Sequence, residues 1–184
     1  MRVIIAQLLF KVSQKMKNIV LIGFMGVGKG SVARAMVKQT AMMALDTDDV
    51  IESIENRSVK EIFAQEGEAY FRNLERKTAR WLKKKVEGTI ISTGGGFFKV
   101  PAMKKVGTVV LLTAPFETIY ERILAHPDSD KKLKKRPLLQ DIEKARALYE
   151  ERLPQYLEVA DIVIDVSDKD VNAIAKEILK KVKK

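Results

Sequence analysis

The chain contains no cysteine and only one histidine among its 184 residues. Without cysteine there is no disulfide, thiolate zinc site or cysteine nucleophile, and a reducing cytosol fits this composition. The single histidine, His126, lies in a charged segment, so we expect neither a Ser-His-Asp triad nor a histidine-rich metal site. The sequence also lacks a run of about 18 apolar residues. We therefore expect a cytoplasmic protein of one globular domain that has no membrane partner.

Positive charge exceeds negative charge, giving a formal net charge of +10. The excess is concentrated in the N-terminal segment, in residues 131–136 and in the tail 180–184. A basic protein can be a nucleic-acid binder, and that alternative stays open. No aromatic residues that could stack on bases alternate with these basic runs, however. We therefore expect solvated charge that attracts anionic substrates, and no nucleic-acid partner.

Residues 1–17 differ from the rest of the chain. Arg2 followed by the apolar stretch 3–10 resembles the start of a signal peptide, but the stretch includes Gln7 and no small-residue cleavage site follows. Met16 lies two residues before the first expected strand. We expect an N-terminal extension that arises from an upstream start codon, and a single domain over residues 18–184. A weak interfacial helix is the alternative.

Apolar runs alternate with helical patterns along the remaining sequence. This alternation predicts an α/β fold in which helices cover both faces of a five-stranded parallel sheet, a three-layer sandwich of the P-loop NTPase type. Ligands of such folds bind outside the carboxyl ends of the strands. The strands are expected at 19–22, 43–46, 89–93, 108–113 and 161–166, and the helices at 31–39, 50–55, 59–65, 68–85, 116–124, 142–156 and 171–181.

A phosphate-binding loop is expected after the first strand. Residues 23–31 read Gly-Phe-Met-Gly-Val-Gly-Lys-Gly-Ser, between a β-branched run and a helix-forming stretch. Glycines at 26 and 28 let successive backbone N–H groups turn towards phosphate oxygens, and Lys29 would reach the terminal phosphates. The sequence therefore predicts nucleoside triphosphate binding by Gly26, Val27, Gly28, Lys29, Gly30 and Ser31.

Gly30 departs from the usual loop. The pattern G-x-x-x-x-G-K-[ST] places a hydroxyl at this position, where it binds Mg²⁺. Ser31 lies about 100° further around the helix and does not simply replace that hydroxyl. Nucleoside monophosphate kinases carry a similar Lys-Gly-Thr loop, and that resemblance implies that Mg²⁺ held through water can serve.

Polar or glycine-rich segments also follow the second and third expected strands. Asp46 and Asp48 are either helix-capping residues or a pair on one side of a strand end, one near Mg²⁺-bound water and one near a hydroxyl acceptor. Residues 92–96 read Ser-Thr-Gly-Gly-Gly. The glycines form either a tight turn with positive φ or a backbone surface whose N–H groups approach an anion.

Three arginines complete a pattern that resembles the shikimate kinase family. Arg72 follows Tyr-Phe in a helix, Arg136 precedes Pro-Leu-Leu, and Arg152 precedes Leu-Pro-Gln-Tyr. With the loop 23–29, Leu-Asp-Thr-Asp at 45–48, Ile-Phe at 62–63, Glu75 and the glycine run, the matches continue in order from residue 18 to about 182. The set differs from that of adenylate kinases. Gluconate kinases share the fold and the loop, but this arginine set is not expected there.

The resemblance implies a role for each matching residue. Asp48 would hold the ring hydroxyls near the reacting oxygen, and Arg72 and Arg152 would grip the substrate carboxylate beside the backbone of Gly94, Gly95 and Gly96. Planar guanidinium groups suit a carboxylate better than lysine does. Arg136 would close over the transferring phosphate from a mobile lid at about 127–140. Asp46 would lie near Mg²⁺, and Arg122 near the adenine. Lys29, Asp48 and Arg136 would be the catalytic residues.

The expected activity is ATP-dependent phosphorylation of the 3-hydroxyl of shikimate to shikimate 3-phosphate, a step of aromatic amino-acid biosynthesis. ATP and Mg²⁺ are the expected cofactors, and we expect a monomer. One alternative is a kinase of another small acceptor, such as gluconate or a nucleotide. A second, indicated by Gly30, is an ATP-binding module without catalysis.

Overall fold

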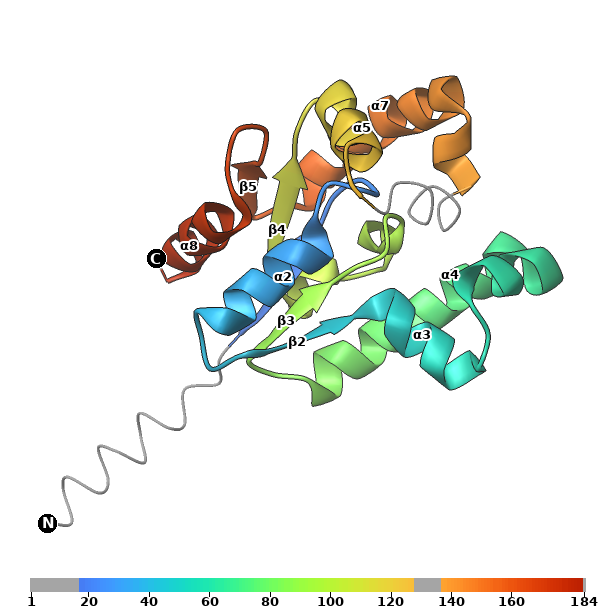
Figure 1. Cartoon of the computed structure of the whole chain (residues 1–184). Coiled ribbons are helices and arrows are strands. Elements are labelled where there is room, and N and C mark those ends of the chain that lie inside the picture. Colours follow the sequence, from blue (N-terminus) through green and yellow to red (C-terminus); the bar gives the residue numbers. More distant parts are fainter. Residues whose placement is uncertain (1–16, 128–136, 184) are drawn as a thin grey trace, which may run out of the picture.

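The computed structural model describes residues 17–127 and 137–183, and its centre is a sheet of five parallel strands in the order β2-β3-β1-β4-β5 (Figure 1). The strands are β1 (Asn18–Ile22), β2 (Met43–Asp46), β3 (Thr89–Ser92), β4 (Gly107–Thr113) and β5 (Ile162–Asp165). The predicted strands are confirmed, with their ends within one residue of the expected positions. All five residues of β1 are buried, as expected for the central strand of a parallel sheet covered on both faces.

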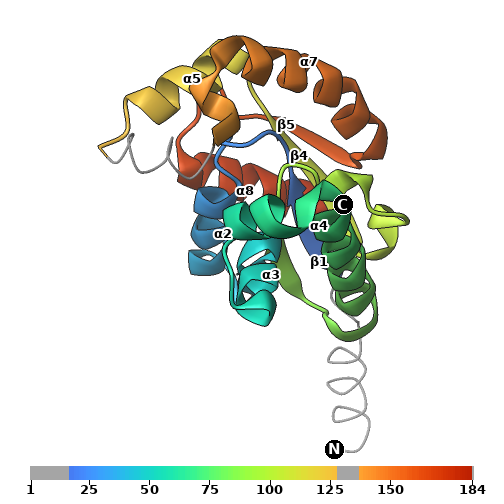
Figure 2. The same ribbon diagram turned by 90° about the vertical axis from the view of Figure 1, so that its right-hand side faces the viewer.

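Helices cover both faces of the sheet, which confirms the predicted three-layer sandwich. Helices α2 (Lys29–Lys38) and α8 (Val171–Val182) pack together on one face, and α4 (Val59–Lys85) lies on the other (Figures 1 and 2). The others are α3 (Thr47–Glu55), α5 (Phe116–Leu124) and α7 (Ile142–Val159), with short 3-10 helices η1 (Phe97–Lys99), η2 (Met103–Lys105) and η3 (Pro137–Gln140).

The two helices expected at 59–65 and 68–85 follow one another as α4, with a break at Gly67. This residue has φ 79° and ψ 177°, a conformation that is essentially restricted to glycine. The start of α4 carries a capping box: Ser58 Oγ accepts from Glu61 N–H at 3.2 Å, and Ser58 N–H donates to Glu61 Oε2 at 2.7 Å.

Helix α3 begins three residues earlier than predicted. The carboxylate of Asp46, at the end of β2, accepts a hydrogen bond from Asp48 N–H at 2.9 Å and caps the helix. Asp48 therefore lies in the first turn of α3. Of the two alternatives for this pair, helix capping is confirmed for Asp46, and the placement of both carboxylates on a strand end was wrong. Helix α2 begins at Lys29, two residues earlier than predicted, because Gly28 turns the chain into the helix with φ 107°.

The order of the strands sets the distances between the expected site segments. Strand β3 separates β2 from β1, so Asp46 does not follow a strand directly beside the phosphate loop. Leu21 of β1 aligns with Ser92 of β3, and Ser92 aligns with Asp46 of β2. The polar segments after β1, β2 and β3 therefore meet at the carboxyl ends of the strands.

Residues 1–16 and 128–136 lie outside the described part of the chain, so the expected extension falls there except for Lys17, as does most of the expected lid with Arg136. Within residues 17–127 and 137–183, no helix combines the length and the apolar character that crossing a bilayer requires.

Candidate active site

The loop between β1 and α2 is closed by its own lysine. The Nζ atom of Lys29 donates to the carbonyl oxygens of Gly23 at 2.7 Å and Phe24 at 3.1 Å, and the side chain is buried. The ring of Phe24 makes edge-on contacts with the rings of Phe116 and Tyr149, and these contacts anchor the loop. The ammonium group is thus fixed at the carboxyl end of the central strand.

Glycines give the loop its shape for two different reasons. Gly26 has φ 88°, and a Cβ there would press on Ile119 Cγ2 at 3.3 Å and Ile123 Cγ1 at 3.1 Å of α5. Gly28 has φ 107°, and a Cβ there would meet no described atom within 4 Å. The first turn of α2 has no side-chain cap from the described residues, and its first backbone bond joins Val32 N–H to Gly28 O at 2.9 Å. The N-terminus of α2 is therefore presented towards the loop, where an anion is favoured.

The remaining loop residues differ in what they present. The side chain of Val27 is 5% exposed and belongs to the core, and its N–H donates to Phe24 O at 3.3 Å. Gly30 leaves a bare position beside Arg34, whose Nη1 would lie 3.5 Å from a Cβ on Gly30. The hydroxyl of Ser31 accepts from Arg34 Nη2 at 3.2 Å on the exposed face of α2. The Ser31 hydroxyl is thus turned towards Arg34, in agreement with the expectation that it does not replace the missing hydroxyl at position 30.

Asp46 is held by two hydrogen bonds at the carboxyl ends of β2 and β3. Its Oδ1 accepts from Asp48 N–H, and its Oδ2 accepts from Ser92 Oγ at 2.6 Å. The described residues include no group of three or more His, Cys, Asp or Glu side chains that could hold a metal ion on their own. Mg²⁺ usually uses one or two protein carboxylates together with phosphate oxygens and water. Asp46, together with the phosphate loop, therefore fits a magnesium ion that binds as a complex with a nucleotide.

Asp48 is a carboxyl group with an altered affinity for protons. Burial is the main cause that raises its pKa, the nearby carboxylates of Asp46 and Glu75 add to the increase, and the charge of Lys29 opposes it, so that the pKa is about 7. Its Oδ1 is buried without a hydrogen-bond partner among the described residues. A carboxyl group of this kind can accept or give up a proton near neutral pH.

Each glycine of the run 94–96 lies against one side chain of the site. A Cβ on Gly94 would stand 3.0 Å from Asp48 Oδ2, one on Gly95 3.5 Å from Arg152 Nη1, and one on Gly96 2.7 Å from Arg72 Cζ. None of the three glycines has positive φ, and the N–H of Gly94 donates to Thr47 Oγ1 at 3.0 Å. The tight-turn reading with positive φ was therefore wrong. Gly94 and Gly96 therefore allow Asp48 and Arg72 to approach the backbone closely, whereas a Cβ on Gly95 would make an ordinary contact with Arg152.

Arg72 is held between two glutamates of its own helix. Its Nη1 donates to Glu75 Oε2 at 2.7 Å, and its Nε and Nη2 donate to Glu68 Oε1 at 3.0 and 2.8 Å. Glu75 is 1% exposed, so burial raises its pKa despite the opposing effect of the neighbouring arginine. The second oxygen of Glu75, Oε1, has no hydrogen-bond partner among the described residues.

Arg152 reaches the same glycine run from α7. Its Nη1 donates to Gly95 O at 3.2 Å, and Tyr156 Oη donates to the same carbonyl at 2.6 Å. Arg152 is 8% exposed, and its Nε has no hydrogen-bond partner in the described part of the chain. Burial also raises the pKa of Tyr156 to about 12, so this hydroxyl stays neutral.

The structure thus brings together Asp48, Arg72, Arg152 and the glycine run, whereas Arg122 lies apart from them. Arg122 Nη2 donates to Val166 O at 2.7 Å and also contacts Ser167 O, just after β5. Four further residues belong to the site but received no role from the sequence: Thr47, Glu75, Ser92 and Tyr156. Glu75 and Tyr156 lie within the matched motifs, and Ser92 ends a buried strand. The sequence therefore marked these residues, but it did not indicate which groups they contact.

Comparisons with known proteins agree with this geometry. The family model described as shikimate kinase matches residues 25–183. The chain belongs to the shikimate kinase family. It is 40% identical over 173 residues to a shikimate kinase of Sulfurihydrogenibium sp., covering 92% of this chain and 99% of that protein. It is 41% identical to a shikimate kinase of Caldanaerobacter subterraneus subsp. tengcongensis over 172 residues, covering 90% and 95%.

Solved structures of the family share the fold. A shikimate kinase from Acinetobacter baumannii in complex with shikimate superimposes with a TM-score of 0.79 at 31% identity, covering 94% of this chain and 96% of that one. The shikimate kinase of Aquifex aeolicus gives a TM-score of 0.73 at 35% identity, covering 90% and 96%. Family membership thus rests on sequence and fold together.

Proposed function

We propose that this protein phosphorylates the 3-hydroxyl of shikimate with ATP and Mg²⁺, giving shikimate 3-phosphate. The observation that carries the proposal is the set of buried polar atoms around the glycine run. Oδ1 of Asp48, Oε1 of Glu75 and Nε of Arg152 have no hydrogen-bond partners among the described residues. Buried polar groups are normally paired, so these atoms favour a polyhydroxylated carboxylic acid as the ligand.

Shikimate carries one carboxylate and three ring hydroxyls, which this set can bind from opposite sides. Arg72 and Arg152 offer guanidinium donors to the carboxylate, and Asp48 and Glu75 accept from hydroxyls. Glu75 also keeps Arg72 in place through the 2.7 Å contact with its Nη1. The glycine run forms the wall between the arginines. Acceptor recognition therefore depends on residues from α3, α4 and α7.

The proposed chemistry needs positioning and charge stabilisation more than covalent catalysis. Asp48, with a pKa of about 7, would accept the proton of the attacking hydroxyl. Lys29 and the N-terminal backbone of α2 would bind phosphate oxygens, and Asp46 would orient water around Mg²⁺. Bound Mg²⁺ supplies neutralisation of phosphate charge. Arg136 is proposed to close over the site, and Arg122 to lie near the base, as the resemblance implies.

A coupled assay of ADP release with shikimate, gluconate and AMP as acceptors tests the proposal. We expect turnover with shikimate and background rates with gluconate and AMP. Turnover with one of the other acceptors would overturn the assignment of the substrate. ATP binding without turnover on any acceptor would favour the ATP-binding module that Gly30 indicates, so a parallel ATP-binding titration completes the experiment.

A further inference from the structure

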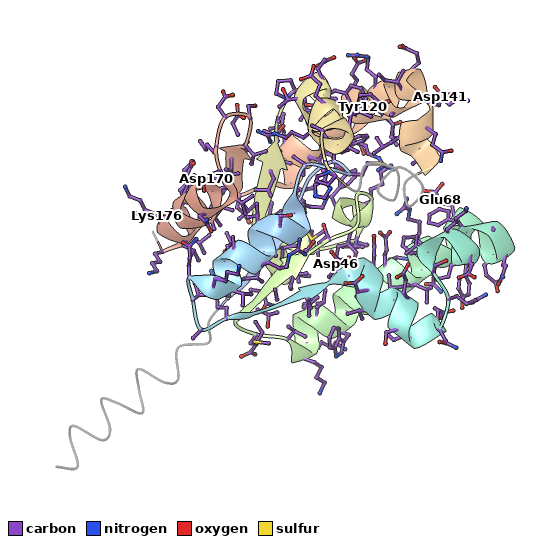
Figure 3. The ribbon with its side chains drawn as sticks, viewed as in Figure 1. Asp46, Glu68, Tyr120, Asp141, Asp170 and Lys176 are labelled. Carbon is purple, nitrogen blue, oxygen red and sulfur yellow. The ribbon has the colours of Figure 1, made fainter. Side chains whose placement is uncertain are left out.

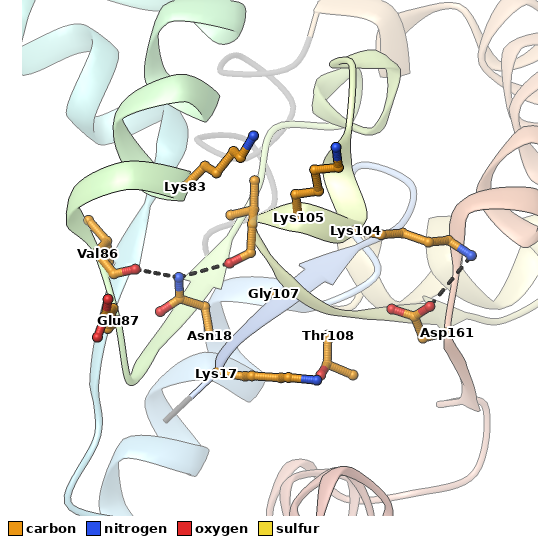
Figure 4. Close-up of a pocket in the computed structure, with 11 residues that line it drawn as sticks. Lys17, Asn18, Lys83, Val86, Glu87, Lys104, Lys105, Gly107, Thr108 and Asp161 are labelled. Atoms are coloured by element: carbon orange, nitrogen blue, oxygen red, sulfur yellow. Dashed lines mark hydrogen bonds and ion pairs between the residues drawn. The ribbon is translucent and has the colours of Figure 1, made fainter. Parts of the chain in front are cut away.

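A cavity lies at the opposite end of the strands from the candidate active site. It has a volume of about 510 Å³ and is formed where β1 and β4 begin and where α4 ends (Figure 4). Ligand sites of open parallel sheets normally lie at the carboxyl ends of the strands, and this cavity lies at the amino ends. It is therefore separate from the phosphate loop and from the glycine run.

The base of the cavity is rigid. Asn18, the first residue of β1, is 4% exposed, and its Nδ2 donates to Val86 O at 2.8 Å and Val106 O at 2.9 Å. Its Oδ1 accepts from Thr89 N–H at 3.1 Å. A single side chain thus ties the end of α4, the start of β3 and the start of β4. Gly107 allows this approach, because a Cβ there would stand 2.7 Å from the carbonyl carbon of Asn18.

Lysines from three segments surround this base. Lys17 precedes β1, Lys83 lies in the last turn of α4, and Lys104 and Lys105 lie in η2. In Figure 4 the side chains of Lys83 and Lys105 extend in the same direction from these two elements. The described lining contains four lysines and two acidic residues, Glu87 and Asp161, so it carries an excess of positive charge.

The carboxylate of Asp161 is held by two contacts. Asp161 Oδ2 accepts from Val109 N–H at 2.9 Å, and Oδ1 lies 3.5 Å from Lys104 Nζ. No ion pair between described residues involves Lys17, Lys83 or Lys105. The last turn of α4 places the negative end of a helix dipole here, and Lys83 complements that end. The dipole accounts for one lysine only, because Lys17 and Lys105 lie on other segments.

We propose that this cavity binds a small phosphate-bearing anion. Lysine binds phosphate as a compact point charge, whereas planar carboxylates are better matched by arginine, and the lining residues that the structure describes include no arginine. The volume lies within the range of small-molecule sites, which favours a phosphorylated organic molecule over free phosphate. Among the described residues of the lining there is also no aromatic side chain that could stack on a nucleotide base.

Binding is tested on the full chain by titration followed through the backbone amide NMR signals of Gly107 and Thr108. ADP without Mg²⁺ is kept saturating, so that the phosphate loop is filled and does not compete. The probes are glycerol 3-phosphate, inorganic phosphate and, as the neutral control, glycerol. We expect saturable shifts with glycerol 3-phosphate, weaker binding of inorganic phosphate, and none with glycerol.

The variant K83Q/K105Q keeps the length of both side chains and removes their charge. We expect its Kd for glycerol 3-phosphate to rise about fivefold to tenfold, the effect of losing two exposed ion contacts. The matched control K60Q/K176Q removes two exposed lysines outside the cavity and should change the Kd less than about twofold. Equal effects of the two double variants, or shifts that do not saturate, would overturn the proposal. Equal affinities for the two phosphate probes would reassign the site to free phosphate.

Discussion

The guanidinium group of Arg72 packs directly on the backbone of Gly96. A Cβ at position 96 would stand 2.7 Å from Arg72 Cζ and 2.8 Å from Nη2, closer than real Cβ contacts allow. Gly96→Ala must therefore displace the end of a flexible side chain and leave the surrounding backbone in place. We expect the KM for shikimate to rise about tenfold or more, while the KM for ATP changes little.

The neighbouring glycine supplies the control for that experiment. A Cβ on Gly95 would meet Arg152 Nη1 at 3.5 Å, an ordinary contact. Gly95→Ala should therefore raise the KM for shikimate much less than Gly96→Ala does. Steady-state kinetics of both variants decide the point, and equal KM values would contradict the close-approach argument.

Arg72→Ala and Arg152→Ala should each weaken the binding of shikimate far more than that of ATP. Removing one partner of a buried charge pair costs roughly 2–5 kcal/mol, so we expect the KM for shikimate to rise by more than about tenfold. Steady-state kinetics with each substrate varied in turn measure the effect. An equal loss of ATP affinity would mean that the assignment of these arginines to shikimate is wrong.

Arg72→Ala should also lower the free energy of unfolding, because it leaves the buried carboxylate of Glu75 without its 2.7 Å partner. Adding Glu75→Gln removes that buried charge. Chemical denaturation of the single and double variants should therefore show partial recovery of stability in the double variant, but no recovery of shikimate binding.

Asp48 should make both activity and stability depend on pH near neutrality. Its pKa is raised from 3.8 to about 7 in the folded protein. The folded state therefore holds the proton more tightly than the unfolded chain, and the stability that this gives is lost as the pH rises from about 4 to 7. Asp48→Asn cannot ionise, so its free energy of unfolding should exceed that of the parent by a margin that grows over this range.

Urea unfolding of the parent and of Asp48→Asn at several pH values from 5 to 8.5 measures that margin. At about 1.4 kcal/mol per pKa unit, we expect it to reach a few kcal/mol at pH 8. The variant should be inactive as a kinase, and kcat/KM of the parent should fall below a pH of about 7. A margin that does not change with pH would contradict the raised pKa.

Gly30→Ser should keep the fold and reduce the concentration of Mg²⁺ needed for half-maximal activity. The backbone at this position is helical, and the nearest atom to a new Cβ, Arg34 Nη1, would lie 3.5 Å away. A hydroxyl at this position of the loop pattern binds Mg²⁺, so the added hydroxyl can replace a metal-bound water. A Mg²⁺ titration at saturating shikimate gives the answer. Lower activity at every Mg²⁺ concentration would instead mean that Gly30 is adapted to its site.

Residues 1–15 should be dispensable for folding and activity. Strand β1 begins at Asn18, and both of its partners, β3 and β4, lie downstream. A chain that starts at Met16 should therefore have the same melting temperature and the same kcat as the full chain. Loss of soluble protein or of turnover in the shorter chain would give the extension a structural role.

The sequence by itself determined the elements of the fold and the chemistry of the phosphate loop. Buried strands and amphipathic helices carry distinct periodicities, and glycines before Lys29 constrain the backbone locally, so both can be read from neighbouring residues. The resemblance to a family likewise rested on motifs that are continuous in the chain. These features depend on interactions within a few residues of sequence.

Only the tertiary structure decided how the segments meet. The position of β3 between β1 and β2 separates Asp46 from the strand that leads into the phosphate loop. The reason for the glycine run was also tertiary, because the side chains that approach Gly94 and Gly96 too closely for a Cβ come from α3 and α4. Strand order and contacts between distant segments depend on the packing of the whole core, which local sequence patterns do not encode.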